Sequence, residues 1–159
     1  AKLVLPKYPD WQWDLYGTGD TLDEIRKKIE EYGLEKQLIL KGNVKDVYQV
    51  YGDYAFLVLP SYREGLPLVL LEAKALGLPM ISFDITTGPR EIINEGEDGY
   101  LIPPYHIEEM AAKIETLIID EKQRILFSKN TEKGIEKFCK RRIYSEWEEL
   151  IETLCGGEE

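Results

Sequence analysis

Two glutamates separated by seven residues carry the clearest chemical signal in this sequence. Glu64 falls in a polar turn that follows an apolar run, and Glu72 interrupts the apolar stretch Leu68–Leu76. A carboxylate accepts two hydrogen bonds and therefore suits a pair of neighbouring hydroxyl groups, such as a sugar diol. Because a carboxylate within a buried segment needs partners, Glu72 is the more unusual of the two. Their spacing alone decides nothing, since pairs of solvated glutamates are common in an acidic chain.

The turn between the glutamates has the composition of an anion site. Gly65 lacks a Cβ and allows the backbone to approach a ligand closely. Pro67 suits the first turn of a helix, whose free N–H groups would be directed at the same turn. A diphosphate there gains about 0.3–1 kcal/mol per favourable charge from the helix dipole. Arg63 and Arg90 could reach a phosphate or a sugar, and a surface ion pair is an equal alternative for Arg63.

The elements that would position this turn alternate between strand and helix. Apolar runs predict strands at 13–16, 37–41, 55–59, 80–83 and 100–102. Helical spacing of apolar residues predicts helices at 22–32, 46–51, 68–76, 89–94 and 107–118, and a helical stretch at 121–154. Thr21 and Glu24 have the spacing of a capping box at the first helix.

Alternation of this kind is typical of a Rossmann-like, doubly wound α/β fold with a parallel sheet. Such sheets bind ligands beyond the carboxyl ends of their strands. The loops at Gly17–Asp20, Gly42–Lys45 and Ser61–Pro67 all follow predicted strands. We therefore expect these three loops to share one edge of the sheet.

Composition restricts the compartment and the partners. The 159 residues fit one domain, placed at 1–155, with a disordered tail at 156–159. The formal net charge of −10 argues against a general nucleic-acid or anionic-membrane surface. Neither a transmembrane stretch of about 18 apolar residues nor a signal peptide is found, so a cytoplasmic protein is expected. Cys139 and Cys155 have no metal-binding spacing and are interpreted as buried or unreactive thiols, and His106 as a solvated residue at a helix start.

The segment around the two glutamates resembles family 4 of the glycosyltransferases, which have the GT-B fold. That family has a pattern close to S-x-x-E-G-x-P-x-x-x-x-E-A-x-A-x-G-x-P. This chain matches the pattern at Ser61, Glu64, Gly65, Pro67, Glu72, Ala73, Ala75, Gly77 and Pro79. Further matches lie at 8–11, 17–20, 38–44, 80–84, 88–93 and 97–103, so the resemblance covers nearly the whole chain.

The resemblance implies the C-terminal, nucleotide-sugar-binding half of a two-domain, retaining glycosyltransferase. Glu64, as the catalytic residue, would contact hydroxyls of the donor sugar, and Glu72 would bind the ribose. Backbone N–H groups near Gly65 and Leu66 would hold the diphosphate. The implied donor site comprises Gly17, Gly19, Asn43, Val44, Arg63, Glu64, Gly65, Leu66, Pro67 and Glu72.

The reaction that the resemblance implies is the departure of a nucleoside diphosphate, followed by attack of the acceptor from the same face. It needs neither a divalent metal nor another cofactor. The acceptor would be a glycan or a lipid-linked glycan of bacterial polysaccharide biosynthesis. Two interpretations fit the basic residues of the C-terminal helices: peripheral membrane contact of the full enzyme, or a solvated helix face, which the interspersed glutamates favour. These basic residues are Arg124, Lys129, Lys133, Lys137, Lys140, Arg141 and Arg142.

The sequence departs from the family pattern at its N-terminal end. The family's domain normally opens with a strand, an Arg–Lys phosphate clamp in a loop, and a first helix, and this sequence starts near the end of that helix. Because the absent strand is central in such sheets, we expect an apolar gap between its two neighbours. The N-terminal acceptor domain is absent as well. The chain alone is therefore expected to bind a nucleotide sugar weakly and to transfer nothing at a useful rate.

Two other functions are compatible with parts of the sequence. Another nucleotide-sugar enzyme of similar fold, such as an epimerase, would need an acid–base set in an interdomain cleft. A non-catalytic α/β interaction module of the receiver type would need an acidic cluster after its first strand and a phosphoacceptor Asp after its third. Asp20 and Asp84 do not form that set.

Overall fold

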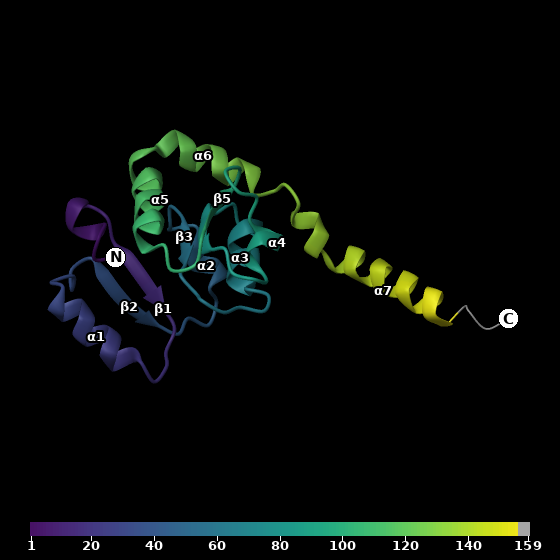
Figure 1. Ribbon diagram of the computed structural model, residues 1–159, viewed down its shortest axis with the longest axis horizontal. Coiled ribbons are helices and arrows are strands. Elements are labelled where there is room, and N and C mark those ends of the chain that lie inside the picture. The colour runs from purple at the N-terminus through teal and green to yellow at the C-terminus, as the bar shows by residue number, and fades with distance from the viewer. Residues whose placement is uncertain (156–159) are drawn as a thin grey trace.

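A computed structural model describes residues 1–155 as an α/β fold with a helical C-terminal part (Figure 1). Its strands are β1 (Trp13–Tyr16), β2 (Leu38–Gly42), β3 (Leu57–Leu59), β4 (Met80–Phe83) and β5 (Gly99–Ile102). Its α-helices are α1 (Leu22–Glu31), α2 (Tyr48–Tyr51), α3 (Leu68–Ala75), α4 (Pro89–Ile92), α5 (Ile107–Ile119), α6 (Glu121–Asn130) and α7 (Lys140–Cys155). Two 3-10 helices, η1 (Leu5–Lys7) and η2 (Ile135–Phe138), complete the set. The tail predicted at 156–159 lies outside the described residues.

The predicted α/β class and the order of its elements are confirmed, with two local differences. The helical stretch after residue 120 is divided near Gly134, whose φ of 79° lies in the left-handed region that glycine adopts readily. The predicted capping box is wrong, because Thr21 is the N-cap of α1 but makes no side-chain hydrogen bond there. Its ψ of 3° departs from the extended backbone that usually accompanies a capping side chain.

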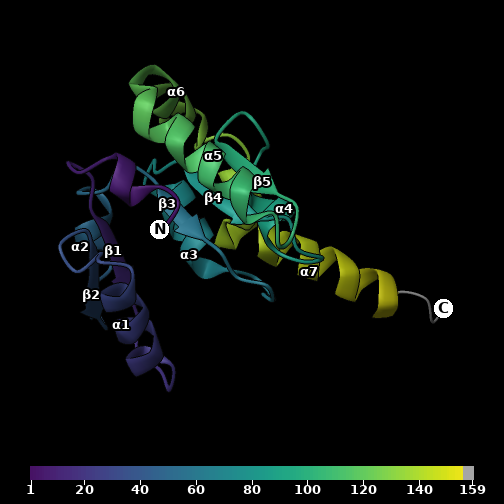
Figure 2. The same ribbon diagram turned by 60° about the vertical axis from the view of Figure 1, so that its left-hand side comes forward.

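The strands form two separate parallel sheets. One pairs β1 with β2, and the other has the order β3-β4-β5. Figure 2 shows β1, β2 and α1 as a unit beside the three-stranded sheet. Within residues 1–155, no backbone hydrogen bond joins the edge strands β1 and β3. The sheet that the sequence predicts is therefore present in two parts.

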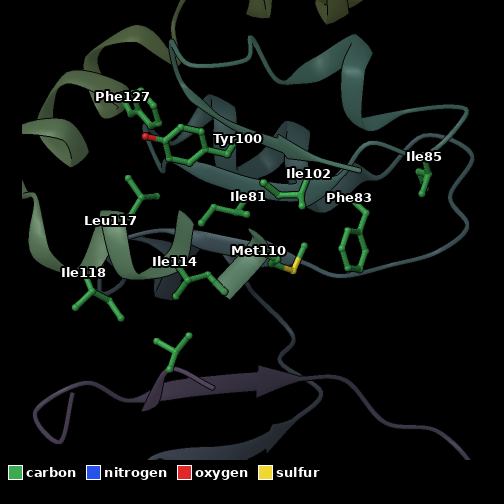
Figure 3. Packing of buried hydrophobic residues seen from close by; sticks show 11 residues of the cluster. Ile81, Phe83, Ile85, Tyr100, Ile102, Met110, Ile114, Leu117, Ile118 and Phe127 are labelled. Atoms are coloured by element: carbon green, nitrogen blue, oxygen red, sulfur yellow. The ribbon is translucent and has the colours of Figure 1, made fainter. Parts of the chain in front are cut away.

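Helices cover both faces of the three-stranded sheet because side chains alternate along its strands. Ile81 and Phe83 of β4 belong to a core cluster with Ile114 and Leu117 of α5, whereas Met80 belongs to a second cluster with α3. Figure 3 shows the α5 side chains gathered beside those of β4 and β5. A strand buried on both faces reads as a nearly continuous apolar run, as β4 does apart from Ser82.

A buried ion pair fastens α3 to the loop that precedes β5. The Lys74 ammonium donates a hydrogen bond to the Asp98 carboxylate, and the two side chains are 1% and 0% exposed. Asp98 also accepts from the backbone N and the Nδ2 of Asn94, each at 2.9 Å. Both charges are thus compensated away from water, which a buried ion pair requires.

The last helix stands apart from this core. Figure 1 shows α7 extending away from the other elements, and none of its residues is buried. Cys139 lies just before α7, and Cys155 is its last residue. Both thiols are free and exposed, so neither is a buried structural thiol. In residues 1–155, no helix combines the length and the apolar character needed to cross a membrane.

Candidate functional site

The turn that carries the first glutamate connects the end of β3 to the start of α3. Pro67 is the N-cap of α3, with a φ of −74° that the proline ring imposes, so the helix begins at the next residue. The N–H groups of Leu68 and Val69 lie in the first helical turn, where an α-helix leaves its donors without intrahelical partners. The positive end of the helix dipole therefore faces the Ser61–Pro67 turn, as the sequence predicts.

The loop after β4 supports this turn from the side. Thr87 Oγ1 donates a hydrogen bond of 2.7 Å to the carbonyl oxygen of Glu64. Gly88 has a φ of 95°, and a Cβ at this position would lie 2.5 Å from Cδ of Pro67 and 2.7 Å from the carbonyl oxygen of Gly65. A glycine is therefore needed for the two loops to pack together. Thr87 was not predicted as a site residue, because a contact between distant loops leaves no periodic signal.

The two glutamates differ in their surroundings. Glu64 is half-buried, and its carboxylate forms no hydrogen bond or ion pair within residues 1–155. Glu72, in the middle of α3, is also half-buried, and its Oε2 accepts a hydrogen bond of 3.0 Å from the hydroxyl of Tyr51. The partner that a carboxylate in an apolar helix requires is thus in part a protein group.

Tyr51 ends α2, and sequence reasoning did not identify it. Its side chain is 5% exposed, and its hydroxyl also lies 3.3 Å from the carbonyl oxygen of Val69. Burial raises the pKa of Tyr51 well above its ordinary value, and the hydrogen bond to Glu72 and the charge of that carboxylate raise it further. The hydroxyl therefore keeps its proton and acts as a donor at every physiological pH.

The other predicted donor-site residues lie in the loops after β1 and β2. The backbone N of Gly17 donates to the carbonyl oxygen of Gly42 at 2.9 Å, and Asn43 Nδ2 donates to Thr18 Oγ1 at 3.1 Å. Gly17, Gly19, Asn43 and Val44 are all exposed. The structure thus brings these residues together as one group. Within the described range, no hydrogen bond joins that group to the Ser61–Pro67 turn, which follows a strand of the other sheet.

An apolar cleft of about 330 Å³ separates the two sheets. Residues of β1 and β3 line it, together with others that include Leu5, Trp11, Tyr51 and Val69. The cleft lies where the sequence predicts an apolar gap, between the edge strands that have no partner on this side.

Polar groups bridge the cleft at one place. The Tyr54 hydroxyl donates a hydrogen bond of 2.6 Å to Asp14 Oδ2 and contacts the hydroxyl of Tyr16, while Lys41 Nζ lies 3.3 Å from the same carboxylate oxygen. Burial acts to raise the pKa of Asp14, but hydrogen bonds from Tyr54, Gln12 and Lys41 outweigh it, so the pKa is lowered. This cluster links β1 to the segment that enters β3.

The surroundings of Arg90, Arg63 and His106 differ from one another. Arg90 donates to both carboxylate oxygens of Asp84, with its Nε at 2.8 Å, so its guanidinium is held after β4. Arg63 is exposed and forms no ion pair with any residue in 1–155, so the surface ion pair considered for it is not found. His106 is the exposed N-cap of α5, which agrees with its interpretation as a solvated helix-start residue.

Comparisons with known proteins find similar sequences and similar folds. The chain is 36% identical over 152 residues to an exopolysaccharide phosphotransferase of Streptomyces coelicolor, a match that covers 95% of this chain and 16% of that protein. It is 34% identical over 154 residues to the poly(ribitol-phosphate) alpha-N-acetylglucosaminyltransferase of Staphylococcus aureus, covering 96% of this chain and 31% of the relative. A crystal structure of Staphylococcus aureus TarM, in complex with fondaparinux, alpha-GlcNAc-glycerol and UDP, matches with a TM-score of 0.89 at 34% identity.

These matches concern only part of each relative. The TarM match covers 94% of this chain and 31% of that chain, so the present sequence spans less than a third of the length of these proteins. Its fold is that of the C-terminal domain of GT-B glycosyltransferases. The model of the family described as glycosyl transferases group 1 matches residues 1–134. This chain therefore belongs to the glycosyl transferases group 1 family.

Proposed function

We propose that this chain is the donor-binding domain of a retaining, family 4 glycosyltransferase that transfers a sugar from a nucleoside diphosphate sugar to a glycan or lipid-linked acceptor. The observation that carries the proposal is the Ser61–Pro67 turn at the N-terminus of α3, with half-buried Glu64 within the turn and half-buried Glu72 on the helix. The fold of the family and the sugar-transferring relatives support it.

The diphosphate binds at the start of α3 in this proposal. Backbone N–H groups of Gly65, Leu66, Leu68 and Val69 provide donors, and the helix dipole adds a favourable field. The exposed guanidinium of Arg63 supplies a positive charge in a chain whose net charge is −10. These groups stabilise the negative charge that develops on the leaving diphosphate.

The two carboxylates hold the two sugar rings of the donor. Glu64, whose carboxylate has no partner among residues 1–155, accepts hydrogen bonds from hydroxyls of the transferred sugar. Glu72 accepts hydrogen bonds from the ribose diol. The UDP in the TarM complex supports uridine diphosphate as the first nucleotide to test. Gly17, Gly19, Asn43 and Val44 form the outer wall of the nucleotide site.

In the reaction, the nucleoside diphosphate departs and the acceptor hydroxyl attacks from the same face, with no divalent metal in the step. Glu64 orients the sugar and is not assigned as a nucleophile. The acceptor site belongs to a domain outside this sequence, and the full enzyme contacts the membrane peripherally when its acceptor is lipid-linked.

The cleft between β1 and β3 completes the proposal. Both strands present an edge that has no strand partner within residues 1–155, and the cleft between them is apolar. We propose that a further strand, outside this sequence, lies between them and joins the two sheets into one. A phosphate clamp following that strand would strengthen donor binding, so the chain alone binds weakly and transfers no sugar at a useful rate.

Nucleotide binding by the purified 159-residue chain tests the central claim. Thermal unfolding is followed with uridine and guanosine diphosphates and with their sugars. We expect one nucleotide to raise Tm and Glu72→Ala to weaken its binding about tenfold or more, the loss expected for hydrogen bonds to a charged group. Glu35→Ala, at an exposed glutamate in the loop after α1, is the matched control and keeps the shift. If no nucleotide raises Tm, the non-catalytic module replaces this proposal.

A further inference from the structure

The Tyr51 side chain is buried and is held in place by core packing. Its ring packs in the core cluster that includes Leu70, Ala73, Leu78 and Met80, and this packing restricts the position of the hydroxyl. The residue lies 21 positions before Glu72 in the sequence and belongs to a different helix. The Tyr51 hydroxyl therefore contacts Glu72 of α3 from a fixed position on another helix.

The direction of the hydrogen bond follows from the chemistry of the pair. A tyrosine hydroxyl carries one proton, and two acceptors lie close to it, Glu72 Oε2 at 3.0 Å and the Val69 carbonyl oxygen at 3.3 Å. The carboxylate is nearer and charged, and hydrogen bonds to charged acceptors are the stronger ones. The proton is consequently directed to Glu72 Oε2.

This bond fixes the orientation of the Glu72 carboxylate but occupies only part of its capacity to accept hydrogen bonds. A glutamate side chain has three rotatable bonds and, when free, samples many orientations of its carboxylate. An ionised carboxylate has about four lone-pair sites, of which Tyr51 occupies one. Within residues 1–155, no hydrogen bond engages Glu72 Oε1. A carboxylate held in this way can still accept hydrogen bonds from the hydroxyls of a ligand diol.

We propose that Tyr51 is a positioning residue, which orients the Glu72 carboxylate toward the two ribose hydroxyls of the donor nucleotide. The inference rests on the proposed function, because it assumes that Glu72 binds the ribose. Tyr51 itself does not touch the donor. Its contribution is to hold the acceptor oxygens of Glu72 in the orientation that the bound diol needs, so that binding does not have to order them.

The test compares two nucleotides that differ only at the ribose. Dissociation constants of the full chain are measured by calorimetry for UDP and for 2′,3′-dideoxyuridine diphosphate. Tyr51→Phe retains the buried ring and removes only the hydroxyl. We expect this variant to bind UDP about three- to tenfold more weakly, the range for one well-placed hydrogen bond, and to bind the dideoxy nucleotide as the parent chain does. Tyr48→Phe, on the same helix but with an exposed ring, is the control and leaves both constants unchanged.

Two further variants separate the possible failures. In Glu72→Ala, the added Tyr51→Phe change should have no further effect on UDP binding, because the two residues act through one contact. Equal weakening of both nucleotides by Tyr51→Phe would overturn the inference, since that result indicates a general packing defect. No weakening of either nucleotide by Tyr51→Phe, with UDP binding lost in Glu72→Ala, would overturn it as well. If Glu72→Ala leaves UDP binding intact, the ribose role assigned to Glu72 in the proposed function is wrong.

Discussion

Gly88 shows how one residue without a side chain can determine the shape of the proposed donor site. The turn that contains Glu64 and Gly65 has no regular secondary structure of its own, and the loop after β4 packs against it. Contact is made by the Thr87 hydroxyl and by the bare Cα of Gly88, which lies against Pro67. The chemistry of the turn therefore depends on a loop that carries none of the proposed ligand-binding groups.

A methyl group at Gly88 should disturb both folding and donor binding. The Cβ of Gly88→Ala would meet Pro67 and the Gly65 carbonyl oxygen, in a backbone with a φ of 95° that alanine adopts poorly. We expect the free energy of unfolding to fall by about 2–4 kcal/mol from strain and overpacking together, and UDP affinity to fall with it. Urea unfolding and calorimetry measure the two effects.

Gly96 provides the matched control for this variant. Its φ of 72° is similarly left-handed, but a Cβ there would meet nothing within 4 Å. Gly96→Ala should therefore show only the backbone cost of about 1 kcal/mol and unchanged UDP affinity. Equal losses in the two variants would mean that the contact between the loops contributes little.

Among the elements, α3 combines two parts of the proposed donor site with a buried ion pair. Its first turn faces the proposed diphosphate, its middle carries Glu72, and Lys74 near its end is paired with buried Asp98. Breaking that pair from one side leaves an uncompensated charge away from water. We expect Lys74→Met to reduce the free energy of unfolding by about 3–5 kcal/mol, as measured by urea denaturation.

A double variant distinguishes the charge from the packing at this position. Lys74→Met combined with Asp98→Asn removes both charges and keeps one acceptor oxygen for the backbone N of Asn94. It should recover a large part of the lost stability, since an apolar or neutral replacement of a buried pair is often close to neutral. A double variant as unstable as Lys74→Met alone would show that packing, rather than the unpaired carboxylate, causes the loss.

The hydrogen bonds of Asp14, which link β1 to the segment before β3, predict that the stability of the fold depends on pH. Asp14 has a pKa below its ordinary 3.8, and its side chain is 6% exposed. A carboxyl group whose pKa is lower when folded stabilises the fold at pH values above its unfolded pKa, and this stability disappears as the pH falls through the folded value. Asp14→Asn should therefore lower Tm at pH 7, by the equivalent of about 1 kcal/mol, and have less effect below pH 3.8. A difference in Tm that is independent of pH would contradict this assignment.

The sequence predicts the strands and helices better than it predicts the contacts between them. Apolar runs and helical periodicity located all five strands within residues 1–155 to within about two residues, because packing against neighbouring elements imposes a local apolar pattern. The Tyr51–Glu72 and Thr87–Glu64 contacts join residues 21 and 23 positions apart, and no local pattern encodes such pairs. The capping box failed for the opposite reason, since its local signal was present but the backbone at Thr21 has the wrong conformation for it.

At the scale of the whole molecule, the chain combines a packed body with two surfaces that its own described residues leave open. One is the cleft between β1 and β3, and the other is α7, on which Tyr144, Trp147 and Leu154 are more than half exposed. Because α7 buries no residue, it contributes little to the stability of the body by burial of apolar surface. The residues just before it behave differently, since Phe138 packs against the core cluster of α3 and Thr131 is completely buried.

Two truncations test whether the packed body of the chain ends before α7. A chain that ends at Cys139 lacks α7 and should keep its Tm within about 2 °C of the full chain, since loss of exposed surface residues alters stability by no more than about 0.5 kcal/mol. A chain that ends at Asn130 also loses Thr131 and Phe138, and it should unfold at a clearly lower temperature because a cavity opens beside α3. UDP affinity should be unchanged by the first truncation, because α7 contains none of the proposed donor-site residues. A large drop in Tm on removal of α7 alone would show that this helix packs on the body in solution, and the separation of body and helix would then be wrong.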